Sequence, residues 1–507
     1  MNKTKQFAVN ALITTATSII ISAVSMGFTV FLSSRIGADG MGLYQLIMTV
    51  YRLAVTFATG GIGLAASRLV SEEAAVGNRA GCTKAVRNCL FYASTLSLFS
   101  GALLFVFSEK IALSWLGDIR TLESLKILAF SLPALSCSSV LCGYFTAMRK
   151  TVKNSAVLML EQYIKISLSA FLLSYLATDL QSACCILVLS GTSAEILSFI
   201  TLFILYLADR RKEFRVKNPK KASDDILNRM LSIALPVALT SYLRSGLSSV
   251  EQMMIPWGLK KYGHSESASL AEYGVIGGMA MPVIMLPAVF ISGFSGLLVT
   301  EIAACRAVDD KARINRIFSF IFRYTLVFSV AVAGILCVFG GEIAMAMYKN
   351  SRAAYFVKIL APLVCVMYLD SVTDSMLKGL NLQKNHMRYN LIDSAVSVIL
   401  TVTLLPAMGI GGYIIVITVS EALNFFLSFR RLLIETGFEV HIFEDIIKPA
   451  ICITVSLFIM HTLSRFMHFS LPLALIITLT LLLYALLLGL MGCITREDGA
   501  FVRRVLK

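Results

Sequence analysis

Two arginines inside apolar stretches are the residues of this sequence best placed to bind a ligand at membrane depth. Arg52 and Arg244 have no opposite charge within four residues. An arginine at the centre of a membrane span costs roughly 2.5–3.5 kcal/mol, so it should face water or a partner. Guanidinium groups match phosphate oxygens with paired hydrogen bonds. Together with Arg35, at the end of the first apolar stretch, they predict a hydrated cavity that binds an anion such as a phosphate group. The alternative is a structural bond to a distant carboxylate or to helix carbonyl groups.

The other charges at membrane depth form two closely spaced groups and several single carboxylates. Glu161 and Lys165 are four residues apart, so they can neutralise each other on one helix face. Asp370 and Asp374 have the same spacing and precede Lys378. Each group is a candidate for proton or sodium coupling, and a structural ion pair is the alternative. Four single carboxylates are further candidates to bind a proton or sodium ion, with capping or pairing as the alternative: Glu195, Glu251, Asp393 and Glu421.

The amino-acid composition shows which class of protein contains these side chains. The chain has 507 residues, of which 57% are hydrophobic and 15% charged, whereas globular domains average about 25% charged. This excludes a soluble fold, a disordered chain and a disulfide scaffold. A span needs roughly 20 apolar residues, and the sequence predicts an all-α membrane protein with fourteen transmembrane helices. They are about 7–33, 42–69, 85–107, 121–147, 155–176, 183–208, 226–256, 270–300, 314–339, 353–379, 388–406, 411–429, 446–464 and 470–494.

The distribution of positive charge predicts the orientation. With fourteen spans, most of the 45 Lys and Arg residues fall on the side of the N-terminus. Cytoplasmic loops carry the excess of positive charge. We therefore expect a protein of the cytoplasmic membrane with both termini in the cytoplasm. The net charge of +15 is then a signal of topology, and nucleic acid is not an expected partner. The opposite side holds only Arg35, Lys110, Arg120, Lys260, Lys261, Lys349, Arg352 and Arg465.

An internal repeat predicts two similar halves. LVSEEAA at 69–75 recurs as LVTEIAA at 298–304, an offset of 229 residues. Six spans separate the copies, and an even number keeps their orientation, so the repeats are parallel. The predicted lobes are residues 1–208 and 226–433. A basic cytoplasmic linker at 209–225 joins them, and residues 434–507 add two helices and a tail. Gly60, Gly61 and Gly63 mark a bendable or closely packed point in the second span.

No signature of an enzyme accompanies these spans. The sequence has no Walker A motif, no HExxH and no large polar loop, so no catalytic residue is predicted. The eleven cysteines lie mostly in apolar runs without CxxC spacing, and they predict neither disulfides nor a metal site.

Four segments resemble a known family. They are IGADGMGLYQL (36–46), GGIGLAASRLVSE (60–72), LEQYIKI (160–166) and LPAMGIGGYII (405–415). In this order and spacing they are similar to the stage V sporulation protein B group, in the polysaccharide-exporter and MurJ-like branch of the MOP flippase superfamily. The resemblance implies a flippase for undecaprenyl-diphosphate-linked glycans, with lipid II or another wall or spore-cortex precursor as cargo. It also implies that the last two spans form a groove for the lipid tail and that Arg52 contacts the diphosphate.

The expected function is therefore alternating-access export of a lipid-linked anionic glycan, without a cofactor and driven by the membrane potential or by proton or sodium coupling. The expected partners are that glycan, membrane lipids and cell-wall synthesis enzymes. A cation-coupled multidrug exporter of the MATE type and a non-transporting scaffold for wall synthesis are the alternatives.

Overall fold

Helices make up nearly all of the described chain. The computed structural model describes residues 3–213, 225–307, 310–437, 443–466 and 472–493, and these ranges contain no strand. Within these ranges, thirteen helical segments are long and apolar enough to cross a membrane. The first of them, Ala16–Ala75, has 60 residues and is about 90 Å long at 1.5 Å per residue, enough for two crossings of a core of about 30 Å. The predicted all-α polytopic fold is confirmed, and the count of fourteen spans agrees with this division.

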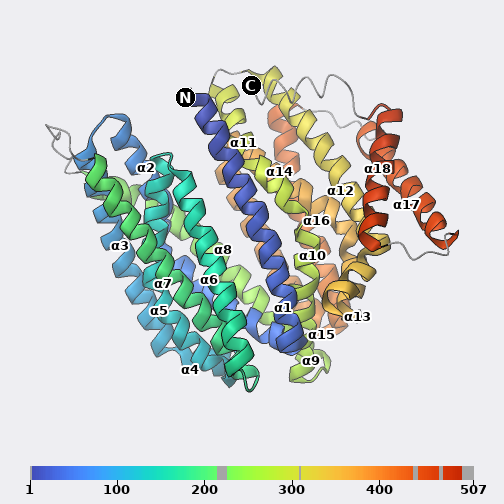
Figure 1. Cartoon of the computed structure of the whole chain (residues 1–507), viewed down its shortest axis with the longest axis horizontal. Helices are drawn as coiled ribbons and strands as arrows, with labels where there is room; N and C mark the ends of the chain where they lie inside the picture. The colour runs from blue at the N-terminus through green and yellow to red at the C-terminus, as the bar shows by residue number, and fades with distance from the viewer. Residues whose placement is uncertain (1–2, 214–224, 308–309, 438–442, 467–471, 494–507) are drawn as a thin grey trace. The chain divides into compact units, whose positions relative to one another are not determined.

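Contacts divide the chain into two compact units. The N-terminal unit comprises Leu12–Thr17 and Arg35–Gly274, and the C-terminal unit comprises Met1–Ala11, Ser18–Ser34 and Val275–Lys507. The N-terminal unit holds α1 from its kink onward and the helices α2–α9 (Figure 1). The main helices are α1 (Lys3–Thr59), α2 (Ile62–Ala75), α3 (Arg79–Val106), α5 (Leu122–Ala147), α6 (Thr151–Leu176), α7 (Leu180–Glu213), α8 (Ile226–Tyr262) and α9 (Glu266–Val275).

Glycines set the breaks in the first two spans. Gly37 has φ 68° and kinks α1 between its two crossings. Gly60 and Gly61 have φ 47° and 69° and end α1 before α2, a conformation that side chains with a Cβ rarely adopt. Gly63 has a different role, since a Cβ there would lie 2.5 Å from Ser139 Oγ. The expected bend and the expected close packing are thus both present, at neighbouring residues.

The C-terminal unit holds the remaining helices. Its eighth span is broken at Pro282 and Pro287 into a π-helical turn (Ile276–Ala280), α10 (Met281–Met285) and α11. Tyr368 Oη donates a 2.7 Å hydrogen bond to the Ile284 carbonyl group beside this break. The other helices are α11 (Ala288–Ala307), α12 (Lys311–Tyr348), α13 (Ser351–Leu360), α14 (Val364–Gly379), α15 (Gln383–Met408), α16 (Ile410–Thr436), α17 (Lys448–Phe466) and α18 (Leu473–Leu490).

The two halves repeat the same helix neighbours. In the first half α5 packs on α2, α3 and α7, and α6 packs on α7. In the second half α14 packs on α11, α12 and α16, and α15 packs on α16. Helix α6 begins at Thr151 and α15 at Gln383, 232 residues later (383 − 151), close to the offset of the sequence repeat. The two halves therefore repeat one pattern of helix contacts. The contact-based units assign α8 to the N-terminal unit, and the lobe boundaries at 208 and 226 stay a prediction.

Two polar bonds attach α18, the second of the two additional helices, to α12. Tyr484 of α18 donates a 2.9 Å hydrogen bond to the Val327 carbonyl group of α12. Arg323 Nη2 of α12 donates to the carbonyl group of Cys493, just beyond the end of α18, at 2.5 Å. The last carbonyl groups of α18 accept from the amides of residues 491–493, so Arg323 satisfies a carbonyl group beyond the helix, and its positive charge near the helix C-terminus complements the helix dipole.

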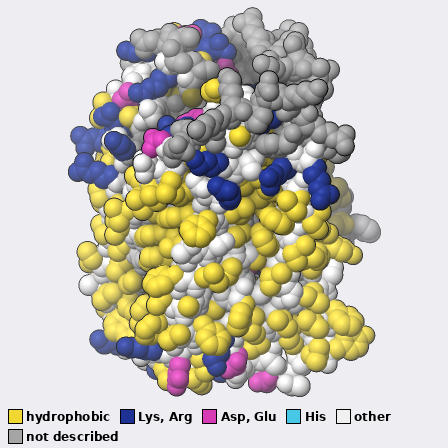
Figure 2. Space-filling model, turned by 90° about the vertical axis from the view of Figure 1, so that its left-hand side faces the viewer, with side chains coloured by type: hydrophobic (Ala, Val, Ile, Leu, Met, Phe, Trp, Pro, Cys, Tyr) yellow, Lys and Arg dark blue, Asp and Glu magenta, His cyan; other side chains and the backbone are white. Residues whose placement is uncertain are grey.

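The surface has the distribution expected of a protein in a bilayer. Figure 2 shows a broad band of hydrophobic side chains across one face of the molecule, with Lys and Arg along one margin and a smaller mixed group of charges along the other. The exposed apolar side chains include Phe91 at 76% and Phe130 at 68% exposure. Such a surface is stable when lipid covers it, and the chain is a multi-pass membrane protein.

Candidate functional site

Arg52 lies in a polar seam between α1 and α8, formed by Thr49, Arg52, Ser248 and Gln252. Its Nη2 donates to Gln252 Oε1 at 2.6 Å and to Thr49 Oγ1 at 3.1 Å. Thr49 Oγ1 lies 2.8 Å from the same amide oxygen, and Gln252 Nε2 donates to Ser248 Oγ at 3.2 Å. These bonds fix the guanidinium group with neutral partners. None of the described carboxylates forms an ion pair with Arg52, so its positive charge stays available.

Arg244 extends this seam along α8. Arg244, Ser248 and Gln252 follow one another at four-residue spacing, so they share one face of the helix. Arg244 is exposed and has no hydrogen bond or ion pair within the described part of the chain. Near its end of the seam, Tyr242 stacks on Phe57 with ring centres 4.5 Å apart, and its hydroxyl donates to the Phe57 carbonyl group. Contacts on both sides of Arg244 therefore hold α8 against α1, and Arg244 lies on α8 about 12 Å along the helix axis from Gln252, the residue that contacts Arg52.

Arg35 belongs to a different place. It is exposed near the Gly37 kink, and the distance along α1 from residue 38 to residue 52 is about 21 Å at 1.5 Å per residue. Asp39, beside the kink, lies 3.8 Å from Arg120, which also forms a 2.6 Å ion pair with Asp118. Arg35 thus lies at the rim of the N-terminal unit, and the structure does not bring it into the seam.

A second polar network fills the interior of the N-terminal unit. Tyr51 Oη lies 2.6 Å from Ser131 Oγ and 2.5 Å from Glu195 Oε2, and Tyr51 and Ser131 are buried. Tyr51 and Arg52 are adjacent on α1, so the same turn presents a tyrosine to the bundle interior and an arginine to the seam. This network joins α1, α5 and α7 at the level of Arg52 and supports the turn that carries it.

Glu161, Lys165 and Glu251 are also in the N-terminal unit. Lys165 approaches α7, where its Cε lies 3.9 Å from the position of a Cβ at Gly191, one turn from Glu195. None of the N···O contacts within 4.0 Å in the described ranges joins Lys165 to Glu161 or Glu195, so their interaction is not a direct salt bridge. Glu251 is half-buried on α8, beside Gln252.

The C-terminal unit contains an acidic cluster, formed by Asp370, Thr373 and Asp374 of α14 with His386 of α15 and Asn424 of α16. Asn424 Nδ2 donates to Asp370 Oδ2 at 2.9 Å, and Asp374 Oδ1 lies 2.7 Å from His386 Nδ1. Asp374 is therefore paired with His386 rather than with Lys378. Asp370 Oδ1, Thr373 Oγ1 and Asn424 Oδ1 are buried and have no hydrogen-bond partner within the described residues. Such oxygens are the ligands that hard cations prefer.

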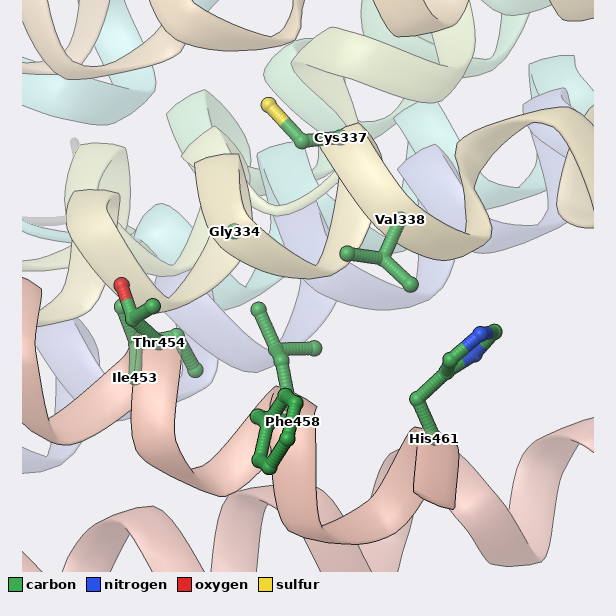
Figure 3. Close-up of a pocket in the computed structure, with 8 residues that line it drawn as sticks. Gly334, Cys337, Val338, Ile453, Thr454, Phe458 and His461 are labelled. Atoms are coloured by element: carbon green, nitrogen blue, oxygen red, sulfur yellow. The ribbon is translucent and has the colours of Figure 1, made fainter. Parts of the chain in front are cut away.

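An apolar groove runs between α12 and α17 in the C-terminal unit. Its volume is about 500 Å³, and α12 supplies Gly334 and Val338 to its wall. Figure 3 shows side chains from both helices along the groove, with Thr454 near one end and His461 near the other. A Cβ on Gly334 would lie 2.7 Å from Ile453 Cγ1, so this glycine permits the close approach of α17.

Several residues of these sites were not predicted from the sequence. Gln252, which holds Arg52, is a neutral residue 200 positions away along the chain. Tyr51, His386 and Asn424 were also missed. The four-residue spacing of Arg244, Ser248 and Gln252 was the one signal that could have revealed part of the seam.

The fold is shared with solved membrane transporters of the MOP superfamily. The structure superimposes on "Lipid II flippase MurJ, inward closed conformation" with a TM-score of 0.69 and 15% identity, covering 95% of this chain and 98% of that one. An inward-facing multidrug resistance MATE family transporter of the same superfamily gives a TM-score of 0.65 at 15% identity, covering 85% and 98%. Identities this low establish the fold alone.

Sequence comparison identifies the family. Stage V sporulation protein B of Bacillus subtilis (strain 168) is 28% identical over 398 residues, which are 76% of this chain and 76% of that protein. Sporulation protein YkvU of the same organism is 19% identical over 334 residues, covering 65% and 73%. The family model described as polysaccharide biosynthesis protein matches residues 7–261. This chain, with its arginine seam inside that matched region, belongs to the polysaccharide biosynthesis protein family.

Proposed function

We propose that this protein is a flippase that moves an anionic lipid-linked glycan, carried on undecaprenyl diphosphate, across the cytoplasmic membrane. The observation that carries the proposal is Arg52, an exposed guanidinium group held by Gln252 and Thr49 without a carboxylate. A structural arginine inside a span would be expected to pair with an acid or with backbone carbonyl groups. A cation fixed by neutral donors and acceptors instead suits the recognition of a diphosphate.

In this proposal, different parts of the protein bind the diphosphate and the polyprenyl chain of the substrate. Arg52 and Arg244 bind the diphosphate, and the groove between α12 and α17 holds the polyprenyl chain in an apolar environment. With both termini in the cytoplasm, as the charge distribution predicts, export moves a net anion outward. An inside-negative potential favours that movement by roughly 2.3 kcal/mol per charge per 100 mV. ATP hydrolysis is then unnecessary.

The acidic cluster of the C-terminal unit is the proposed coupling site. Asp370, Thr373 and Asn424 present buried oxygens without a partner among the described residues, and a sodium ion or a proton would satisfy them. Occupation would neutralise Asp370 and change how α14 and α16 pack, which is a local event able to bias a two-state transporter.

A reconstituted flipping assay tests this function. The purified full chain in liposomes is offered a panel of undecaprenyl-diphosphate-linked sugars, including lipid II, with and without an imposed potential. We expect protein-dependent flipping that an inside-negative potential accelerates and that Arg52→Ala with Arg244→Ala abolishes at equal protein content. Flipping that does not depend on either arginine would overturn the proposal.

The acidic cluster also favours one second candidate, a cation-coupled exporter of the MATE type. Sodium- or proton-driven transport of ethidium by the same liposomes, unaffected by loss of the two arginines, would support it. If the double arginine variant complements a deletion strain at normal protein level and no transport is found, the remaining explanation is a scaffold for wall-synthesis enzymes.

A further inference from the structure

A second groove lies in the C-terminal unit, where α12 turns into α13. Lys349 ends α12 with φ 51°, and Asn350 Oδ1 caps α13 by accepting from the Ala353 amide at 3.1 Å. The two helices run antiparallel from this turn and enclose a groove of about 410 Å³, within the 300–1,000 Å³ of ligand sites. Its walls include Glu342, Met345, Ser351, Tyr355 and Lys358.

The groove carries one negative and one positive side chain that do not neutralise each other. Glu342 and Lys358 are both exposed, and neither has an ion pair or hydrogen bond within the ranges that the structure describes. A Cβ on Gly341 would lie 2.6 Å from Lys358 Cε and 3.1 Å from its Nζ. The glycine thus lets the lysine lie flat against α12, beside the residue that carries the carboxylate.

The depth of this pair places it at the border of the headgroup layer. Lys358 is seven residues from the start of α13, about 10 Å along the helix axis. Tyr348, Lys349, Arg352 and Tyr355 surround the turn, and tyrosines and basic residues mark the membrane interface. Unpaired charges facing lipid at this depth are costly, so the groove favours an occupant that brings both opposite charges.

We propose that this groove binds the headgroup of a phospholipid that carries a primary ammonium group, such as phosphatidylethanolamine. The lipid phosphate accepts hydrogen bonds from Lys358, and the lipid ammonium donates to the Glu342 carboxylate. The hydroxyl groups of Ser351 and Tyr355, the latter 49% exposed, add donors for the phosphate. A choline headgroup has no N–H to donate to Glu342, and an anionic glycerol headgroup leaves that carboxylate unpaired. This site is independent of the arginine seam and of the transported substrate.

Native mass spectrometry of the full chain in detergent tests the proposal, with the dioleoyl forms of phosphatidylethanolamine, phosphatidylcholine and phosphatidylglycerol titrated separately. We expect the ethanolamine lipid to bind at least about tenfold more tightly than the other two, the worth of one charge-assisted hydrogen bond. Glu342→Gln should abolish that preference, and Lys358→Gln should weaken all three lipids. Lys349→Gln, which removes a charge at the same turn without lining the groove, should change nothing.

Two binding results would overturn the inference. One is equal binding of the three lipids by the unmodified protein, and the other is an ethanolamine preference that survives Glu342→Gln. Melting temperatures in lipid-free detergent separate lipid binding from a direct Glu342–Lys358 pair. Because the two side chains are unpaired, each single variant should melt within about 2 °C of the unmodified protein. A larger loss in both variants would show that the two side chains bind each other instead of a lipid.

Discussion

Arg52 Nη2 lies 2.6 Å from Oε1 of Gln252, on a helix 200 residues further along the chain. The amide oxygen orients the guanidinium group and leaves its charge intact. A carboxylate at the same position would hold it equally well and would cancel that charge. A neutral partner therefore indicates an arginine that binds a ligand rather than one that only stabilises packing. The substitution of Gln252 by Glu, which exchanges the amide nitrogen for an oxygen, tests this interpretation.

Gln252→Glu is the sharpest test of the seam. The side chain keeps its length and its acceptor oxygen, but it adds a negative charge beside Arg52, so flipping of a diphosphate-linked substrate should fall by roughly 10- to 100-fold, as loss of a charge-assisted hydrogen bond predicts. Arg52→Ala should lose at least as much, and Arg52→Lys should be intermediate because lysine lacks the planar fork. Arg68→Ala is the matched control, because that arginine is 64% exposed and only pairs with Glu72 within α2. If the initial flipping rate of Gln252→Glu in liposomes is unchanged, the seam does not bind the transported substrate.

A cation site in the acidic cluster predicts a sodium-dependent melting temperature. Binding at 100 times the dissociation constant adds about 2.7 kcal/mol to the free energy of unfolding. Sodium chloride should therefore raise the melting temperature more than choline chloride at equal ionic strength, and Asp370→Asn should remove the difference. Glu435→Gln is the control, because that carboxylate lies near the end of α16, outside the cluster, and pairs with Arg431 at 2.9 Å. Equal melting in the two salts would exclude sodium and leave a proton as the coupling ion.

The sequence predicted the features that depend on local composition, namely the spans and the charges inside them. It did not predict the partners that helix packing brings together. The spans follow from runs of about 20 apolar residues, whatever helices they later contact. Arg52 and Arg244 were noticed because a charge in an apolar run is costly wherever it lies. Gln252 was missed since a neutral amide carries no such cost, and its importance depends on which face of α8 meets α1.

Glycine packing between α1 and α9 predicts a selective loss of stability. A Cβ on Gly42 would lie 1.9 Å from the Leu270 carbonyl oxygen, a backbone atom that cannot turn aside. Gly42→Ala should cost about 1–3 kcal/mol or more through overpacking and lower the melting temperature. Gly246→Ala on α8 meets no atom within 4 Å, and alanine is favoured in helices by about 1 kcal/mol, so this control should be neutral or stabilising. Equal melting of the two variants in the same detergent would contradict the close contact.

Arg229 predicts a double-mutant effect at the start of α8. Its Nη1 lies 2.8 Å from Glu73 Oε1 and its Nη2 lies 2.5 Å from Glu72 Oε2, which joins α8 to α2. Glu73 is buried and also accepts from Asn78 at 2.8 Å, so Arg229→Ala leaves an uncompensated buried carboxylate and should cost about 1–3 kcal/mol. Glu73→Gln in that background should recover part of the loss, because the amide needs no counter-charge, while Glu72→Gln should recover little since Glu72 is 39% exposed. The coupling free energy follows from the melting temperatures of the unmodified protein, Arg229→Ala, Glu73→Gln and the double variant. Purely additive losses would show that Arg229 does not stabilise Glu73.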